Sequence, residues 1–167
     1  MQTEFDSDKG FKWSSSLLIE LTGIILILLF WVFTFFLFPI IPEDIPTHFN
    51  MEGKPDSFGS KTSVFLLPGI ASVIFILLTV VNRRPERFNY PVIINEQNAE
   101  SQYRLAGNFI RFLKIFIVLI FWVIFYFSTA LTHAQRSSLG KYLLPVLLLL
   151  TFFPVLTYLI IASKHKS

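Results

Sequence analysis

Long apolar runs, separated by shorter polar stretches, dominate the pattern of this chain. Each run has the roughly 20 mostly apolar residues that a helix needs to cross the hydrocarbon core of a bilayer. The runs cover residues 17–38, 63–81, 112–131 and 142–162. The pattern therefore predicts an all-α integral membrane protein, with four transmembrane helices in a single membrane domain over residues 17–163.

Composition agrees with a membrane protein. Hydrophobic residues make up 53% of the chain and charged residues 15%, whereas soluble domains average about 25% charged. The chain has no cysteine, which excludes disulfides, thiolate metal ligands and a thiol nucleophile. The first run follows a stretch that is acidic as well as basic and precedes prolines instead of a small-residue cleavage site. We therefore interpret it as a retained helix and not a signal peptide.

The distribution of lysine and arginine predicts the orientation. With the N-terminus in the cytoplasm, ten basic residues lie inside and four outside, as the positive-inside rule requires. The inside residues are Lys9, Lys12, Arg83, Arg84, Arg87, Arg104, Arg111, Lys114, Lys164 and Lys166, and the outside ones are Lys54, Lys61, Arg136 and Lys141. We expect a multi-pass protein of the cell membrane with cytoplasmic tails at residues 1–16 and 164–167. Glu20 is expected at the cytoplasmic interface near the positive end of the first helix, in preference to an ion-relay role.

The cytoplasmic connection, residues 82–114, carries a helix signal in its second half. Asn95 is a good N-cap and is followed by Glu96. Apolar side chains then recur at steps of four and three, at Ala99, Tyr103, Ala106, Ile110 and Leu113. The spacing predicts an amphipathic helix that begins near Glu96 and leads into the third span.

The same helix has a basic side. We expect Tyr103, Arg104, Arg111 and Lys114 to form a cytoplasmic interface, with the three cations contacting anionic lipid headgroups. Docking of a cytoplasmic partner on this face is the alternative.

The outer loop, IPTHFNMEGKPDSFGSK at residues 45–61, is rich in residues that favour turns. Prolines before and within it end the first helix and keep the chain extended. The stretch from Asn50 to Gly53 favours a turn in which the glycine takes a positive φ, and Pro55, Asp56 and Gly59 indicate another. The sequence thus predicts an ordered extracytoplasmic loop that is longer than most connections, and such loops are often functional.

The pattern IP-x-HFN-x-x-G-x-PD-x-x-GSK, followed by a helix with LPG, resembles a bacterial membrane domain family of unknown function. That domain also occurs in SdpI-type immunity proteins, which protect a toxin producer from its own secreted peptide toxin and carry a second membrane module. The stretch at residues 89–106 is similar to the cytoplasmic connection of the same group. The resemblance implies a partner-binding loop and no catalytic residue. Its motif positions are Pro46, His48, Phe49, Asn50, Gly53, Pro55, Asp56 and Gly59.

Other chemistries find less support in the residues. The metal-ligand types on the outer side are Glu43, Asp44, His48, Glu52, Asp56 and His133, but no closely spaced histidine pair occurs among them and no metal is expected. A hydroxyl nucleophile would have to be one of Thr47, Ser57, Ser60 and Ser128. The sequence around these residues does not resemble a hydrolase motif. The basic residues follow the membrane ends, so nucleic acid is not expected as a partner.

The sequence therefore favours a non-enzymatic membrane protein, without a cofactor, that recognises a peptide, toxin or protein partner through its outer loop in immunity or signalling. An accessory subunit of a membrane transporter or envelope complex is the first alternative. A metal-dependent membrane enzyme is the second. The lipid bilayer is the one partner that composition demands, and the oligomeric state stays open.

Overall fold

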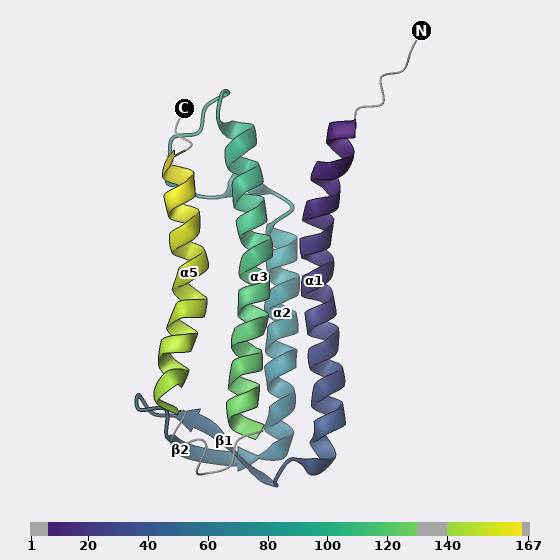
Figure 1. The fold of residues 1–167 in the computed structure, drawn as a ribbon, viewed down its shortest axis with the longest axis vertical. Helices are drawn as coiled ribbons and strands as arrows, with labels where there is room; N and C mark the ends of the chain where they lie inside the picture. The colour runs from purple at the N-terminus through teal and green to yellow at the C-terminus, as the bar shows by residue number, and fades with distance from the viewer. Residues whose placement is uncertain (1–6, 130–139, 165–167) are drawn as a thin grey trace.

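The computed structural model describes residues 7–129 and 140–164, with side chains from residue 16 onward. Four long helices lie side by side (Figure 1). They are α1 (Ser7–Leu37), α2 (Leu66–Val81), α3 (Ala99–Thr129) and α5 (Leu143–Lys164). The segments Ser16–Ile40, Lys61–Val81, Ala99–Thr129 and Gly140–Lys164 are long and apolar enough to cross a membrane. The prediction of a multi-pass membrane protein with four apolar helices is confirmed.

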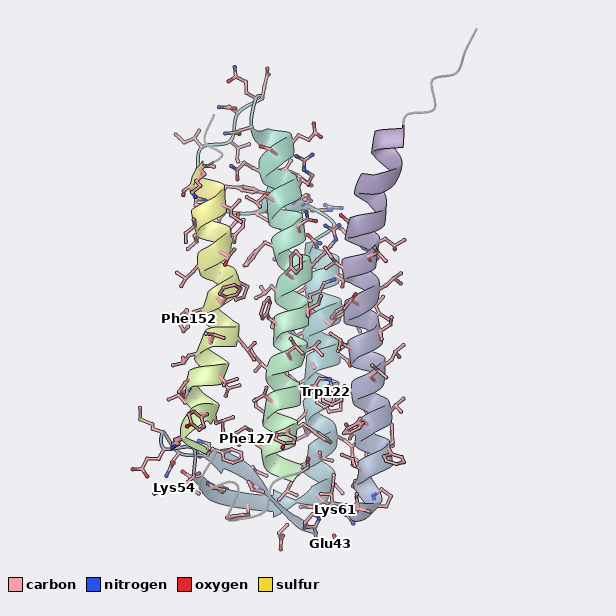
Figure 2. All side chains as sticks on the ribbon, in the orientation of Figure 1. Glu43, Lys54, Lys61, Trp122, Phe127 and Phe152 are labelled. Atoms are coloured by element: carbon pink, nitrogen blue, oxygen red, sulfur yellow. The ribbon has the colours of Figure 1, made fainter. Side chains whose placement is uncertain are left out.

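Helix α3 organises the bundle because it packs against α1, α2 and α5, and α1 also touches α2. The start of α1 and the end of α5 lie at one end of the bundle, which we call the terminal end. The buried apolar core lies toward the other end. There the Phe30 ring stacks on Trp122 at 4.9 Å between centroids and meets Phe125 edge-on at 5.5 Å, and Figure 2 shows Trp122 between the helices.

The loop after α1 is a β-hairpin, so the all-α prediction needs a correction here. Strands β1 (Asp44–Phe49) and β2 (Pro55–Ser60) pair antiparallel across the end of the bundle opposite the terminal end (Figure 1). We call this the hairpin end. The pairing shifts register on both sides of His48, and the burial of β1 does not alternate. Because period-two alternation is the main sequence signal of a strand, this irregular, proline-containing hairpin gave none.

The hairpin turn is built by Asn50 and Gly53. The Asn50 side-chain Oδ1 accepts hydrogen bonds from the backbone N–H groups of Glu52 (3.0 Å) and Lys54 (2.9 Å). The Asn50 carbonyl accepts another from the N–H of Gly53 (2.8 Å), whose φ is +72°. That left-handed conformation is accessible to glycine at little cost, so the turn depends on a glycine at this position.

Two contacts fix the hairpin to the helices. The backbone of Gly53 lies against that of Gly140, at the start of η4 (Gly140–Tyr142), so closely that a Cβ atom on either residue would overlap the other. The Phe49 ring meets Phe127 of α3 edge-on at 6.4 Å. The hairpin is thereby held between the ends of α3 and α5.

The connection from α2 to α3 follows the predicted pattern. The Asn95 side chain accepts hydrogen bonds from the N–H groups of Gln97 and Asn98, and α3 begins at Ala99. The predicted apolar face, Ala99, Tyr103, Ala106, Ile110 and Leu113, is buried or half-buried throughout. This amphipathic segment is the first part of α3 itself. At about 1.5 Å per residue the whole helix measures roughly 46 Å and exceeds the hydrocarbon thickness of about 30 Å.

Aromatic packing holds this connection against α3. Tyr103 lies beside Tyr90, with 5.6 Å between ring centroids, and the Tyr90 hydroxyl donates to the carbonyl of Pro85 at 2.7 Å. Burial raises the pKa of Tyr90 to about 12. The hydroxyl therefore stays protonated and keeps its donor role through the physiological pH range.

The close approach of Gly53 and Gly140 predicts a sharp steric limit. Gly53→Ala combines an unfavourable φ with an overlap, and we expect it to lower the free energy of unfolding by about 1–3 kcal/mol or more. Gly140→Ala should destabilise through overlap alone. Thermal unfolding in detergent measures both. Gly69→Ala is the matched control, because no atom lies within 4 Å of its added Cβ. Equal melting temperatures for all three variants would contradict this packing.

Candidate functional site

Most of the predicted loop-motif residues build the hairpin. Pro46 is buried, Phe49 packs on α3, and Pro55 begins β2. Asn50 and Gly53 form the turn described above. A Cβ atom on Gly59 would lie 3.0 Å from the Thr47 side chain, so this position also favours glycine. The roles of these residues are explained by architecture.

His48 and Asp56 are different, because the structure leaves them accessible. Their side chains form a hydrogen bond across the strands, 2.5 Å from Nδ1 to Oδ1, and are 68% and 43% exposed. The turn beside them presents Met51, which is 87% exposed, and β2 presents Phe58, which is 51% exposed. Polar and apolar groups are thus both exposed on the hairpin, and we call the set His48, Met51, Asp56 and Phe58 the hairpin face.

Other charged pairs lie around the hairpin face. Figure 2 shows Lys54 at the turn and Glu43 and Lys61 at the base of the hairpin, where the latter two pair at 2.8 Å. A hydrogen bond and the charge of Lys54 lower the pKa of Glu52, and the reciprocal effects raise the pKa of Lys54. The pair of Glu52 and Lys54 is exposed, and surface pairs of this kind contribute little to stability. Lys61 is only 19% exposed, so its pair with Glu43 is partly buried.

Among the described residues, no three His, Asp or Glu side chains come together as metal ligands would. His133, the second outer histidine, lies outside the described residues. Of the hydroxyls named from the sequence, Thr47 donates to Ser57 at 3.4 Å and Ser60 caps η2 (Lys61–Phe65). Ser128 is buried.

A second polar site lies inside the bundle toward the terminal end. Lys114 of α3 is only 1% exposed, and its Nζ donates to Glu20 Oε1 of α1 at 2.5 Å and to Thr79 Oγ1 of α2 at 2.9 Å. The ammonium also lies 4.4 Å from the centroid of the Phe75 ring, within the range of a cation–π interaction. We call Glu20, Phe75, Thr79 and Lys114 the Lys114 cluster. It joins three helices.

The local sequence explains why these helices can meet so closely. A Cβ atom on Gly23 would lie 2.6 Å from the Phe75 ring, so only glycine permits this approach of α1 to α2. The Thr79 hydroxyl donates to the Phe75 carbonyl at 2.8 Å. Its lone pairs therefore remain available to the ammonium of Lys114.

The four residues predicted to form a cytoplasmic interface do not form one cluster in the structure. Arg104 is exposed and lies 4.0 Å from Glu100, and Tyr103 packs on Tyr90. Arg111 is half-buried, and its Nη1 donates to Asn108 at 3.0 Å. The expectation that Lys114 contacts headgroups is wrong, because Glu20 and Thr79 enclose its ammonium.

Sequence reasoning missed the pairing of Glu20 with Lys114, and the structure shows that Glu20 lies on the inner side of α1. One row of buried and half-buried positions along α1 has steps of four and three, namely Ser16, Glu20, Gly23, Ile27, Phe30 and Thr34. A carboxylate in such a stripe faces other helices, so a buried cation is the partner to search for.

Comparison with known proteins finds similarity to sequences of unknown function. Residues 25–71, from within α1 through the hairpin into α2, match a domain of unknown function (DUF1648). Over 77 residues the chain is 34% identical to an uncharacterized protein of Archaeoglobus fulgidus. That match covers 41% of this chain and 42% of the relative, so it spans less than half of either. No solved structure matches. These similarities support a membrane family of unknown function.

The Lys114 cluster predicts an asymmetric response to neutralisation. Glu20→Gln leaves an unpaired cation that is almost fully buried, whereas Lys114→Met leaves a carboxylate with 24% exposure. We expect Glu20→Gln to be the more destabilising, on the order of 3 kcal/mol. The double variant should regain stability over Glu20→Gln, because no charge remains buried.

Thermal unfolding in detergent of the two single variants and of the double variant measures the interaction between the Glu20 and Lys114 side chains. The exposed pair of Glu100 and Arg104 is the control, because neutralising Glu100 should leave the melting temperature unchanged. A double variant that is merely the sum of the two single effects would show that the two side chains do not interact.

Proposed function

We propose that this is a non-enzymatic membrane protein that binds a peptide, a peptide toxin or a protein partner through the hairpin face. The observation that carries the proposal is the division within the hairpin. One set of residues anchors it to α3 and α5, whereas His48 and Asp56 are exposed as a preformed hydrogen-bonded pair. Because both side chains are exposed, packing against the helices does not explain why these two residues occur here.

A fixed hairpin suits recognition for an energetic reason. Binding to a mobile loop loses the entropy of ordering that loop, and a preorganised surface avoids much of this cost. The turn hydrogen bonds of Asn50 and the contact of Gly53 with Gly140 both restrict the hairpin backbone. The hairpin face therefore keeps one geometry before its partner arrives.

The hairpin face also indicates the chemistry of the partner. An exposed histidine–aspartate pair offers both signs of charge when the histidine is protonated, and Met51 and Phe58 offer apolar contact. In the described residues the sheet contains only β1 and β2, and an extended peptide can add to an unpaired strand edge. A short amphipathic peptide fits these features, in agreement with the immunity role that the SdpI-type resemblance implies.

This role requires the hairpin to face the outside of the cell membrane. The described cations support that orientation through the positive-inside rule. Among residues whose side chains are described, seven lie toward the terminal end, namely Arg83, Arg84, Arg87, Arg104, Arg111, Lys114 and Lys164, and three toward the hairpin end, namely Lys54, Lys61 and Lys141. Both tails are then cytoplasmic.

Thiol labelling tests the orientation, since the chain has no cysteine of its own. Ser57→Cys on β2 and Glu96→Cys before α3 each introduce one exposed thiol. In whole cells an impermeant maleimide should label the first and not the second, and both should react after the cells are opened. If only the Glu96→Cys variant were labelled in intact cells, the protein would have the opposite orientation and the proposal would be wrong.

Crosslinking and pull-down from native membranes tests the proposed recognition. His48→Ala and Asp56→Ala should each reduce partner recovery by about tenfold, the loss expected from one charge-assisted contact. Their melting temperatures in detergent should stay near that of the unsubstituted protein. Glu52→Gln is the control, because it removes the pair with Lys54, a different and fully exposed ion pair at the same end.

The outcomes separate the candidate functions. Full partner recovery with folded His48→Ala and Asp56→Ala variants would refute recognition through the hairpin face. Recovery of a larger membrane protein, unaffected by these variants, would favour the accessory-subunit alternative.

A further inference from the structure

The terminal end of the bundle contains a polar cleft of about 600 Å³ between α1, α2 and α3. Its lining includes Ser16, Glu20, Thr79, Asn82, Arg83 and Arg111, with Lys114 at its inner side. The cleft is independent of the hairpin face, which lies at the opposite end of the bundle.

The charge of the cleft is strongly positive. Glu20 is the one carboxylate in its lining, and Lys114 already pairs with it. Arg111 donates to the neutral side chain of Asn108. Within the side chains that the structure describes, the guanidinium charges of Arg83 and Arg111 therefore have no carboxylate partner.

The position of the cleft matches that of lipid phosphates. From Glu20 to Ile40, near the hairpin, α1 and η1 (Phe38–Ile40) rise about 30 Å at roughly 1.5 Å per residue. This is about the thickness of the hydrocarbon core. When the hairpin lies at one membrane surface, the cleft consequently lies at the other.

An apolar groove of about 470 Å³ continues from the cleft along α1 and α2. Glu20, Thr79 and Arg83 line both spaces. Farther along, the groove is lined by Ile24, Leu28, Ile76 and Val80. At its far part the Trp31 indole N–H donates to Ser72 at 3.0 Å, which ties the two helices together there.

We propose that this combined space binds one anionic phospholipid, with its phosphate on Arg83 and Arg111 and an acyl chain in the groove between α1 and α2. Guanidinium groups bind phosphate oxygens through paired hydrogen bonds. Charge complementarity selects an anionic headgroup, and the apolar groove selects a hydrocarbon chain instead of a free phosphate ion. The bound lipid would fill the gap between α1 and α2 beside the Lys114 cluster.

Native mass spectrometry of the full chain in detergent tests the proposal, after addition of an equimolar mixture of phosphatidylglycerol and phosphatidylcholine. The unsubstituted protein should retain phosphatidylglycerol in preference. Arg83→Gln with Arg111→Gln should reduce that retention by about tenfold or more. Arg87→Gln is the matched control, because this exposed arginine lies at the same end but lines neither space. An equal loss with Arg87→Gln would overturn the proposal in favour of diffuse surface charge.

Further variants distinguish the lipid from other occupants. Ile76→Trp fills the groove and should reduce lipid retention while both arginines remain. The lipid assignment would be overturned if inorganic phosphate raised the melting temperature as much as phosphatidylglycerol does, and by the same amount in Ile76→Trp. A dimer that added lipid does not dissociate would place a second copy of the chain in this space. That result would also overturn the lipid assignment. If the double glutamine variant does not fold, Arg83→Lys with Arg111→Lys keeps the charge and should still weaken retention.

Discussion

The ion pair between Lys114 and Glu20 is the constraint on which the arrangement of α1, α2 and α3 depends. Removing a charge from water costs several kcal/mol, and in a bilayer no solvent compensates for it. The ammonium of Lys114 is almost completely buried, so the three helices must stay at the rotations that present Glu20 and Thr79 to it. Apolar packing brings the helices together, but this pair specifies their relative orientation.

The two ends of the bundle are stabilised by different physics. At the hairpin end, aromatic packing around Phe30 and a steric fit between Gly53 and Gly140 hold the β-hairpin. At the terminal end, the cleft is lined by Lys114, which is paired with Glu20, and by Arg83 and Arg111, which pair with no carboxylate among the described side chains. The surface proposed for recognition and the cleft proposed for lipid binding therefore share no residues.

Much of the fold follows from local sequence, because a span of sufficient length and hydropathy is recognisable without its neighbours. The Asn95 turn and the apolar face of α3 are local in the same way. The hairpin was read as a turning loop because Pro46 and the register shifts beside His48 hide the alternation of a strand. The pairing of Glu20 with Lys114 joins positions 94 residues apart. It depends on the rotation of three helices, which no local pattern encodes.

Exchange of the two charges tests the central role of the ion pair most directly. Glu20→Lys places two cations together, and Lys114→Glu places two carboxylates together, so each single variant should fail to fold or melt far below the unsubstituted protein. Combining both restores opposite charges, and the Thr79 hydroxyl can donate to a carboxylate as readily as it accepts from an ammonium. We predict that the exchanged protein recovers most of the melting temperature in detergent, with some loss from the missing contact to Phe75. An exchanged protein no more stable than the single reversals would contradict the account.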